Sequence, residues 1–200
     1  MTPAIQRIAF LFLFSFSSYS FAGHPAADRM VDILEEGVRI INLSGATQKK
    51  AMCRFISKYV DHQTIATELL GSYNRGSDSS GVREFKREAE SFMATKAFPK
   101  LQSLSGESGS FDVSDRVTNK PGGKYSVPVT IRTSKGKTYN GRAILNSSLD
   151  LVDVEYLGFS GVSYVGRDVR KEISKFDRTS APVSNYLDDL RSSEDFIPCR

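Results

Sequence analysis

The chain has 200 residues, including 27 Lys or Arg and 23 Asp or Glu, for a formal net charge of +4. This length is enough for one domain with a substantial core. The charges are interspersed rather than clustered, which argues against a nucleic-acid partner and leaves open a mild attraction to anionic membrane surfaces.

The first 22 residues have the pattern of a secretory signal peptide. Arg7 precedes the apolar run 8–16, and small and polar residues follow up to Ala22. The run is about half as long as the roughly 20 residues that a membrane span requires, and no second long apolar run follows. We therefore expect cleavage after Ala22 and export of residues 23–200, with a retained anchor as the alternative.

Helical spacing of apolar residues dominates the next 80 residues. It predicts a helix over 28–43, a second one after a turn at 44–47, a short helix from about Asp61 to Gly71, and a long amphipathic helix from about 79 to 95. Thr47 is a suitable N-cap residue for the second of these helices, and the stretch from Asp78 to Ser80 offers a cap for the fourth.

The sequence pattern over 108–159 predicts antiparallel strands. Apolar residues take every second position from Tyr125 to Ile131, and the polar Ser126 and Thr130 lie on the other face. The segment 133–137 places Gly136 where a hairpin reversal needs a positive φ. We expect three or four strands with one apolar face, followed by a turn and a helix over 160–176 and a tail over 177–200 with one helical turn near 186–190.

The order of helices, strands and a final helix predicts an α+β domain. Its antiparallel sheet of about four strands has one apolar face, which helices must cover. We divide the chain into a signal peptide (1–22), one domain (23–176) and the C-terminal tail (177–200).

The chain has two cysteines, Cys53 and Cys199. In an exported protein, one disulfide that closes a long loop is the simplest arrangement, and it would attach the tail to the helical half. Two unpaired thiols are the alternative.

The sequence contains little that points to catalysis. Cys53, Asp61 and His62 could be combined into a thiol hydrolase, but no nucleophile motif surrounds them, and a capping Asp followed by a partly exposed His is the simpler interpretation. Residues with metal-ligand spacing are missing, as is a phosphate-binding Gly-rich loop, and Asp150, Asp153 and Glu155 fit the solvated face of a strand. We expect neither enzymatic activity nor a cofactor or metal.

What remains is a set of apolar side chains that helices and sheet offer one another. Composition alone favours an ordinary closed core. The set consists of Ile65, Leu69, Phe85, Phe92, Phe98, Leu101, Leu104, Phe111, Val127, Val129, Ile131, Ile144, Val152 and Val154.

Three features of the sequence occur together. They are Val60-Asp61 with Ile65-Ala66 and Leu70-Gly71, the residues Phe85 and Phe92 on one predicted helix, and an ending that runs from Val152-Asp153-Val154 through Gly161-Val162-Ser163 to Arg170, Ile173 and Phe176. In these features, over roughly 30–176, the chain resembles the MlaC, or toluene-tolerance, family of periplasmic phospholipid-binding proteins.

The resemblance implies a carrier in the periplasm that holds acyl chains between its helices and sheet, in contact with the apolar set above. Its partners would be the phospholipid itself, an inner-membrane ABC-type lipid transporter complex and an outer-membrane lipoprotein complex, with a role in maintaining lipid asymmetry. A hopanoid-related lipid carrier is one alternative, and an exported interaction or assembly module without a ligand is another.

Overall fold

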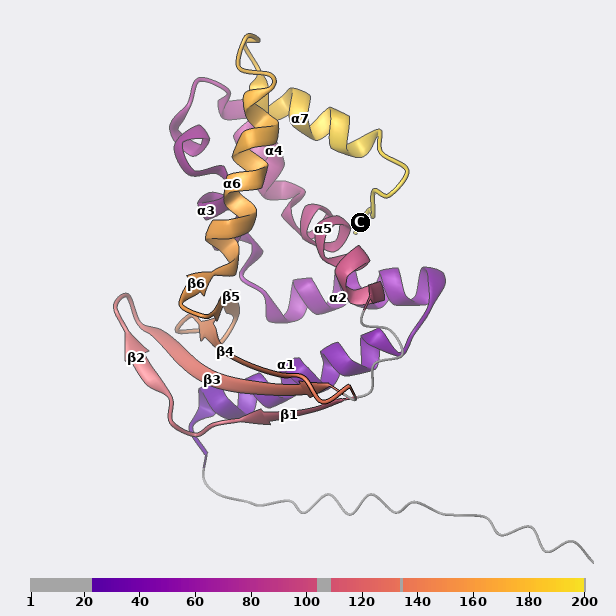
Figure 1. Ribbon diagram of the computed structural model, residues 1–200. Helices are drawn as coiled ribbons and strands as arrows, with labels where there is room; N and C mark the ends of the chain where they lie inside the picture. The colour runs from indigo at the N-terminus through magenta and orange to yellow at the C-terminus, as the bar shows by residue number, and fades with distance from the viewer. Residues whose placement is uncertain (1–22, 104–108, 134, 200) are drawn as a thin grey trace, which may run out of the picture.

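The computed structural model describes residues 23–103, 109–133 and 135–199 (Figure 1). The expected signal peptide lies outside these residues. Among these residues, five α-helices precede the sheet and two follow it: α1 (Pro25–Ile41), α2 (Gly45–Tyr59), α3 (His62–Leu70), α4 (Ser79–Arg87), α5 (Ala89–Ser103), α6 (Gly161–Ser174) and α7 (Pro182–Arg191). A short 3-10 helix, η1 (Gly71–Arg75), links α3 to α4. The α+β class predicted from the sequence is confirmed. None of the described helices combines the length and hydropathy that a membrane span requires.

The sheet is antiparallel and has six strands among the described residues. They are β1 (Gly109–Val113), β2 (Thr118–Lys120), β3 (Lys124–Thr133), β4 (Thr138–Leu145), β5 (Leu151–Tyr156) and β6 (Phe159–Ser160), in the order β1-β3-β4-β5-β6, with β2 also paired to β3. The hairpin expected at 133–137 joins β3 to β4, and Gly136 has φ 76°. The sequence predicted about four strands because β2 and β6, with three and two residues, are too short to show alternation.

Most of the helices stand above the β5–β6 edge of the sheet (Figure 1). Residues from α3, α4, α5, α6 and α7 form one buried cluster, in which Phe85 and Phe92 lie with ring centroids 5.1 Å apart. The connections of this helical part to the sheet edge include a β-bridge and a direct continuation of the chain. Val60, just before α3, forms a parallel bridge with Leu151 of β5, and α6 begins directly after β6.

Two aspartates fix helix starts and tie distant segments together. Asp61 accepts hydrogen bonds from the Thr64 N–H that it caps and from Asn146 Nδ2 beyond β4. Asp78 accepts from the N–H groups of Gly81, in α4, and Ser184, in α7. Because N-cap carboxylates satisfy backbone donors that have no partner within the helix, each residue stabilises both a helix and a tertiary contact.

The structure departs from the sequence predictions in two helical regions. The long helix expected over 79–95 is two helices, α4 and α5, separated at Glu88. Arg191 of α7 reaches Glu84 (2.7 Å) and Glu88 (3.1 Å) there, so contacts with a distant helix accompany the break. The stretch expected to be a tail with one helical turn contains the ten-residue α7, which buries four side chains, Val183, Tyr186, Leu187 and Leu190, in the helical core.

Candidate functional site

The apolar face of the sheet is only partly covered by a helix. Near the start of β3 and the end of β4, residues Val127, Val129, Ala143 and Leu145 are at most 8 % exposed. They pack with Ala26, Ala27, Met30 and Ile33 on the buried side of α1. This part of the face is an ordinary closed core, as the alternation in β3 predicted.

Beyond α1 the same face carries a row of large apolar residues that crosses the sheet. Phe111 is the register partner of Ile131, and Ile131 is the partner of Tyr139. The ring of Tyr139 lies 6.1 Å from that of Tyr156, and Tyr156 is the partner of Phe159. We call these five residues the apolar ladder. Because paired residues project to one face, the ladder is a continuous apolar strip from β1 to β6.

The ladder stays open to solvent although its residues are large. Ile131, Tyr139 and Tyr156 are 42, 40 and 44 % exposed, and Phe159 at the sheet edge is 76 % exposed. Val154, next to Tyr156 on the same face, is 49 % exposed. Single exposed apolar residues are common, but a contiguous strip of this size in a folded protein indicates a binding surface.

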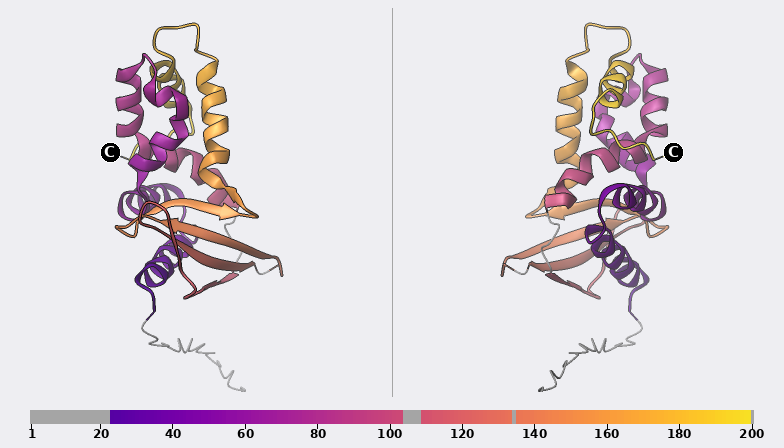
Figure 2. Two further views of the ribbon diagram at one scale, coloured as in Figure 1. Left: turned by 90° about the vertical axis from the view of Figure 1, so that its left-hand side faces the viewer. Right: turned by 90° about the vertical axis from the view of Figure 1, so that its right-hand side faces the viewer.

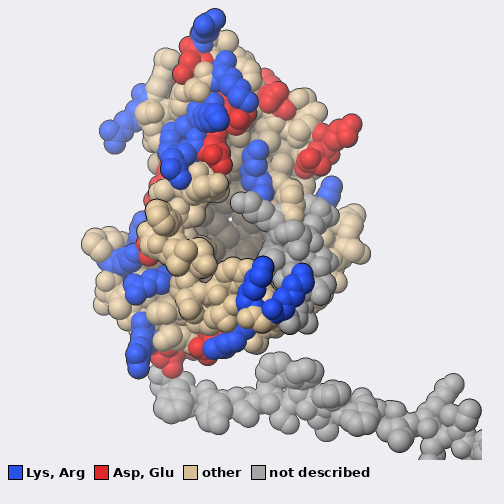
Figure 3. Space-filling view, viewed as in Figure 1, with Lys and Arg blue, Asp and Glu red and all other residues tan. Residues whose placement is uncertain are grey.

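The molecule is hollowed between the helices and the sheet (Figure 3). Where described residues form the visible rim of this hollow, they are mostly uncharged, with Lys or Arg side chains on the sheet side. A second concavity, a cleft of about 350 Å³ between α5, α6 and α7, has charged walls that include Lys96, Glu172, Asp189 and Asp195. Since desolvating charges is costly, that cleft suits apolar chains poorly.

The predicted apolar set is divided among several places. Ile65, Leu69, Phe85 and Phe92 lie in the helical core at 9 % exposure or less, and Val127 and Val129 lie under α1. Phe111, Ile131 and Val154 belong to or adjoin the open strip. Contact of these residues with lipid stays a prediction.

Two predicted sheet residues are not brought to the strip. Ile144 is the partner of Ser126, so it lies on the opposite face, and it is 4 % exposed. Val152 is 1 % exposed and lies beside the register shift between β4 and β5. The predicted residues Phe98, Leu101 and Leu104 lie outside the described side chains.

Sequence reasoning missed the aromatic part of the strip. Tyr139, Tyr156 and Phe159 were not among the predicted residues, although Tyr139 and Tyr156 continue the alternation of β4 and β5. Counting tyrosine as an apolar residue would have identified Tyr139 and Tyr156, because the tyrosine ring is apolar and only its hydroxyl needs water.

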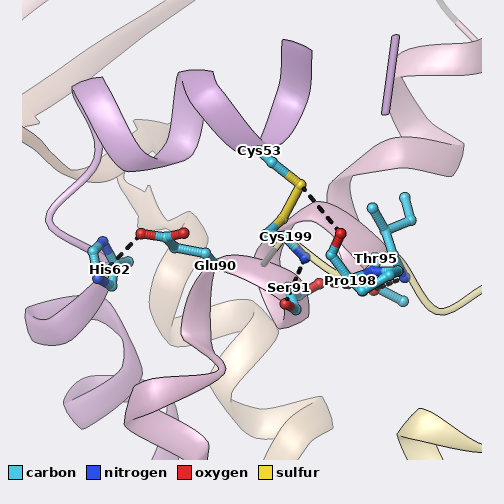
Figure 4. Close-up of a disulfide and its surroundings, with 8 residues drawn as sticks. Cys53, His62, Glu90, Ser91, Thr95, Pro198 and Cys199 are labelled. Atoms are coloured by element: carbon cyan, nitrogen blue, oxygen red, sulfur yellow. Dashed lines mark hydrogen bonds and ion pairs between the residues drawn. A yellow bond between two sulfur atoms is a disulfide. The ribbon is translucent and has the colours of Figure 1, made fainter. Parts of the chain in front are cut away.

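The predicted disulfide is confirmed. Cys53 of α2 and Cys199 of the C-terminal segment are joined, and the N–H of Cys199 donates to Ser91 Oγ of α5 (Figure 4). Ile197, 2 % exposed, packs with α1, α2 and α5, and its N–H donates to Thr95 Oγ1. The end of the chain therefore fastens α2 to α5.

The Cys53–Cys199 disulfide also excludes the hypothesis of a thiol hydrolase, because the Cys53 sulfur is not a free thiol. His62 instead lies 3.7 Å from Glu90 (Figure 4). Burial raises the pKa of the Asp61 carboxyl, but the hydrogen bonds donated by Thr64 and Asn146 outweigh it and leave the pKa below its ordinary value. This is the behaviour expected of a helix-capping residue. Among the described residues no group of three or more His, Cys, Asp or Glu is arranged to hold a metal ion.

Comparison with solved structures identifies the fold as one seen in a lipid-binding protein. The chain is similar to the phospholipid-binding protein from Ralstonia solanacearum, whose structure was determined in complex with a phospholipid. The TM-score is 0.58 at 10 % sequence identity, over 82 % of this chain and 95 % of that one. No family model matches the chain, and no curated protein matches it significantly. At this identity the likeness shows a shared fold.

Proposed function

We propose that this protein is a phospholipid carrier of the periplasm and that four residues of the apolar ladder, Phe111, Ile131, Tyr139 and Tyr156, form the floor of the hollow in which the acyl chains lie. The observation that carries the proposal is the open strip itself: four sheet residues, Ile131, Tyr139, Val154 and Tyr156, keep 40–49 % of their surface exposed on a face whose other part is closed by α1. The shared fold with a protein solved with a phospholipid supports the same ligand.

The energetics explain why a carrier needs such a strip. Each methylene removed from water is worth about 0.8 kcal/mol, so two chains of roughly 15 carbons resist leaving a membrane by on the order of 25 kcal/mol. A carrier must offset this with apolar surface that is open before the lipid arrives. In this proposal the helical core, which is already closed, holds the hollow in shape, and the ladder contacts the chains.

Within the same proposal the protein receives and delivers lipid at membrane complexes. We assign it an inner-membrane ABC-type lipid transporter complex and an outer-membrane lipoprotein complex as partners, in the maintenance of lipid asymmetry. The resemblance around 60–71 and 152–176 motivates these partners, and the signal-peptide pattern of 1–22 motivates the compartment.

A transfer assay tests the proposed function. Donor vesicles contain a phospholipid with a fluorophore on its head group together with a quenching lipid, and acceptor vesicles contain neither. Catalytic amounts of the mature protein should speed the rise of fluorescence in proportion to protein concentration. Transfer no faster than in protein-free samples would contradict the proposal and favour an interaction module without a ligand.

A further inference from the structure

Two hairpins of the sheet project on the same side of the molecule. In both views of Figure 2 the β3–β4 and β5–β6 hairpins point the same way, towards the side that faces the viewer in Figures 1 and 3. The hollow also opens on this side (Figure 3). Whatever meets this side of the protein meets the two hairpins and the opening together.

The end of the β5–β6 hairpin is poorly suited to water. Its two turn residues, Leu157 and Gly158, have φ 51° and 81°. A two-residue turn with both φ positive ordinarily carries Asn-Gly, because a bulky residue is strained there. Here Leu157 is 74 % exposed and the adjacent Phe159 is 76 % exposed. The strain at Leu157 is a cost that Asn would avoid at this position, and the exposure of the two apolar side chains is unfavourable unless the tip has an apolar environment to enter.

The neighbouring start of α6 extends this apolar tip. Tyr164 is 56 % exposed, and the guanidinium of Arg167 lies 5.4 Å from the centre of its ring. An aromatic ring with a cation beside it is typical of residues at the boundary between lipid head groups and acyl chains.

The other hairpin is basic. Between residues 116 and 149 the chain has seven Lys or Arg and no Asp or Glu. Arg132, Lys135 and Lys137 are exposed at the end of the β3–β4 hairpin, and Arg142 is exposed further along β4. The end of this hairpin, with Arg132, Lys135 and Lys137, therefore presents positive charge on the side where the apolar tip projects.

We propose that this side of the protein docks on the surface of an anionic lipid bilayer. Leu157 and Phe159 enter the head-group boundary, the basic β3–β4 hairpin meets anionic head groups, and the hollow then faces the membrane. Charge complementarity favours a bilayer over a second copy of this chain, because two copies would bring like charges together. The docking surface extends the proposed carrier function, but its test does not require bound cargo.

Flotation of the mature protein with extruded vesicles tests the proposal. The vesicles contain phosphatidylethanolamine with phosphatidylglycerol, and phosphatidylcholine alone serves as the neutral comparison. The main variant is Leu157→Asn, because Asn tolerates positive φ and suits this turn, so the fold should remain intact. We expect it to lower binding to anionic vesicles about tenfold, since it removes one inserted apolar side chain.

Two further variants separate charge from insertion. Lys135→Gln and Lys137→Gln should each weaken binding about fivefold. Raising the salt from about 50 mM to about 500 mM should abolish most binding of the unmodified protein, because the Debye length falls below the distance to most head groups. Neutral vesicles should bind far less protein at either salt concentration.

A fluorescent reporter checks which part of the surface enters the bilayer. The sequence has no Trp, so Phe159→Trp supplies a single Trp at the tip, and Val38→Trp, at the 43 % exposed position on α1, supplies a matched control. The emission of Phe159→Trp should shift to shorter wavelength with anionic vesicles, and that of Val38→Trp should not.

Several results would overturn the docking surface. They are a lack of flotation with anionic vesicles, unchanged flotation of Leu157→Asn, an equal shift for both Trp variants, or a response at the tip only to a protein partner. Normal lipid transfer alongside any of these results would leave the carrier function intact, whereas flotation without transfer would refute the carrier function alone.

Discussion

Placing one negative charge in the apolar ladder should empty the protein of lipid without unfolding it. Ile131→Asp introduces a carboxylate in the apolar ladder, where Ile131 is 42 % exposed. A matched control, Asn140→Asp, adds the same charge to the neighbouring strand on the opposite face. Asn140 Oδ1 accepts a hydrogen bond from Thr130 Oγ1, and an Asp oxygen can accept it equally well.

The expected magnitudes follow from exposure. An exposed portion of about 70 Å² on Ile131, covered by lipid, is worth about 2 kcal/mol at 25 cal/mol per Å². Desolvating a carboxylate against an acyl chain adds at least about 1–3 kcal/mol, so lipid retention should fall 100-fold or more. The folded protein loses little, about 1 kcal/mol or less, because the site is already half open to water.

Two measurements check this prediction side by side. Bound phospholipid per protein is quantified in organic extracts of each purified variant, and the free energy of unfolding is taken from urea titrations. Ile131→Asp should be nearly lipid-free and Asn140→Asp nearly full, with both folded. Equal lipid content in the two variants would refute the assignment of the ladder as the lipid-facing surface.

Two further predictions concern stability. Reduction of Cys53–Cys199, which are 146 residues apart in sequence, should lower the free energy of unfolding by up to about 5 kcal/mol, as loop-closure entropy gives for a loop of this length; a loss below about 1 kcal/mol in urea titrations with and without reductant would show that the tail contacts hold α2 and α5 without it. Burial raises the pKa of Asp78, but the hydrogen bonds donated by Ser184 and Gly81 outweigh it and leave the pKa below its ordinary value. Its stabilisation is therefore present above the unfolded-state pKa of about 3.9 and is lost as the pH falls through the lower folded-state pKa. Asp78→Asn should cost about 1–2 kcal/mol at neutral pH, and the difference from the unmodified protein should close in acid; a gap that stays constant down to the acid transition would contradict this linkage.

The sequence predicted local structure well where one periodicity dominates. The alternation from Tyr125 to Ile131 identified the apolar face of β3, and Gly136 located the hairpin. How much of that face α1 covers could not be predicted, because coverage depends on where a distant helix lies. Val129 and Ile131 therefore look equivalent in the sequence, yet one is 8 % and the other 42 % exposed.

The helical errors have similar causes. The break at Glu88 involves neither Gly nor Pro, and Arg191, about 100 residues away, lies against it. In α7 the spacing of Val183, Tyr186, Leu187 and Leu190 was helical, and Pro182 stands at a favourable first position. The many Ser and Asp residues around this short helix obscured the helical spacing in the sequence. The helix is stabilised by burying these four side chains in the helical core.

Bound phospholipid on the open strip of the sheet can be detected by mass spectrometry of the mature protein, purified without detergent from a Gram-negative host. Native spectra of the intact complex are compared with spectra of its organic extract. We expect a mass increment equal to one or more two-chain phospholipids, in near-stoichiometric amount, and the same species in the extract. A lipid-free protein that also takes up no lipid from vesicles would contradict the proposed carrier function.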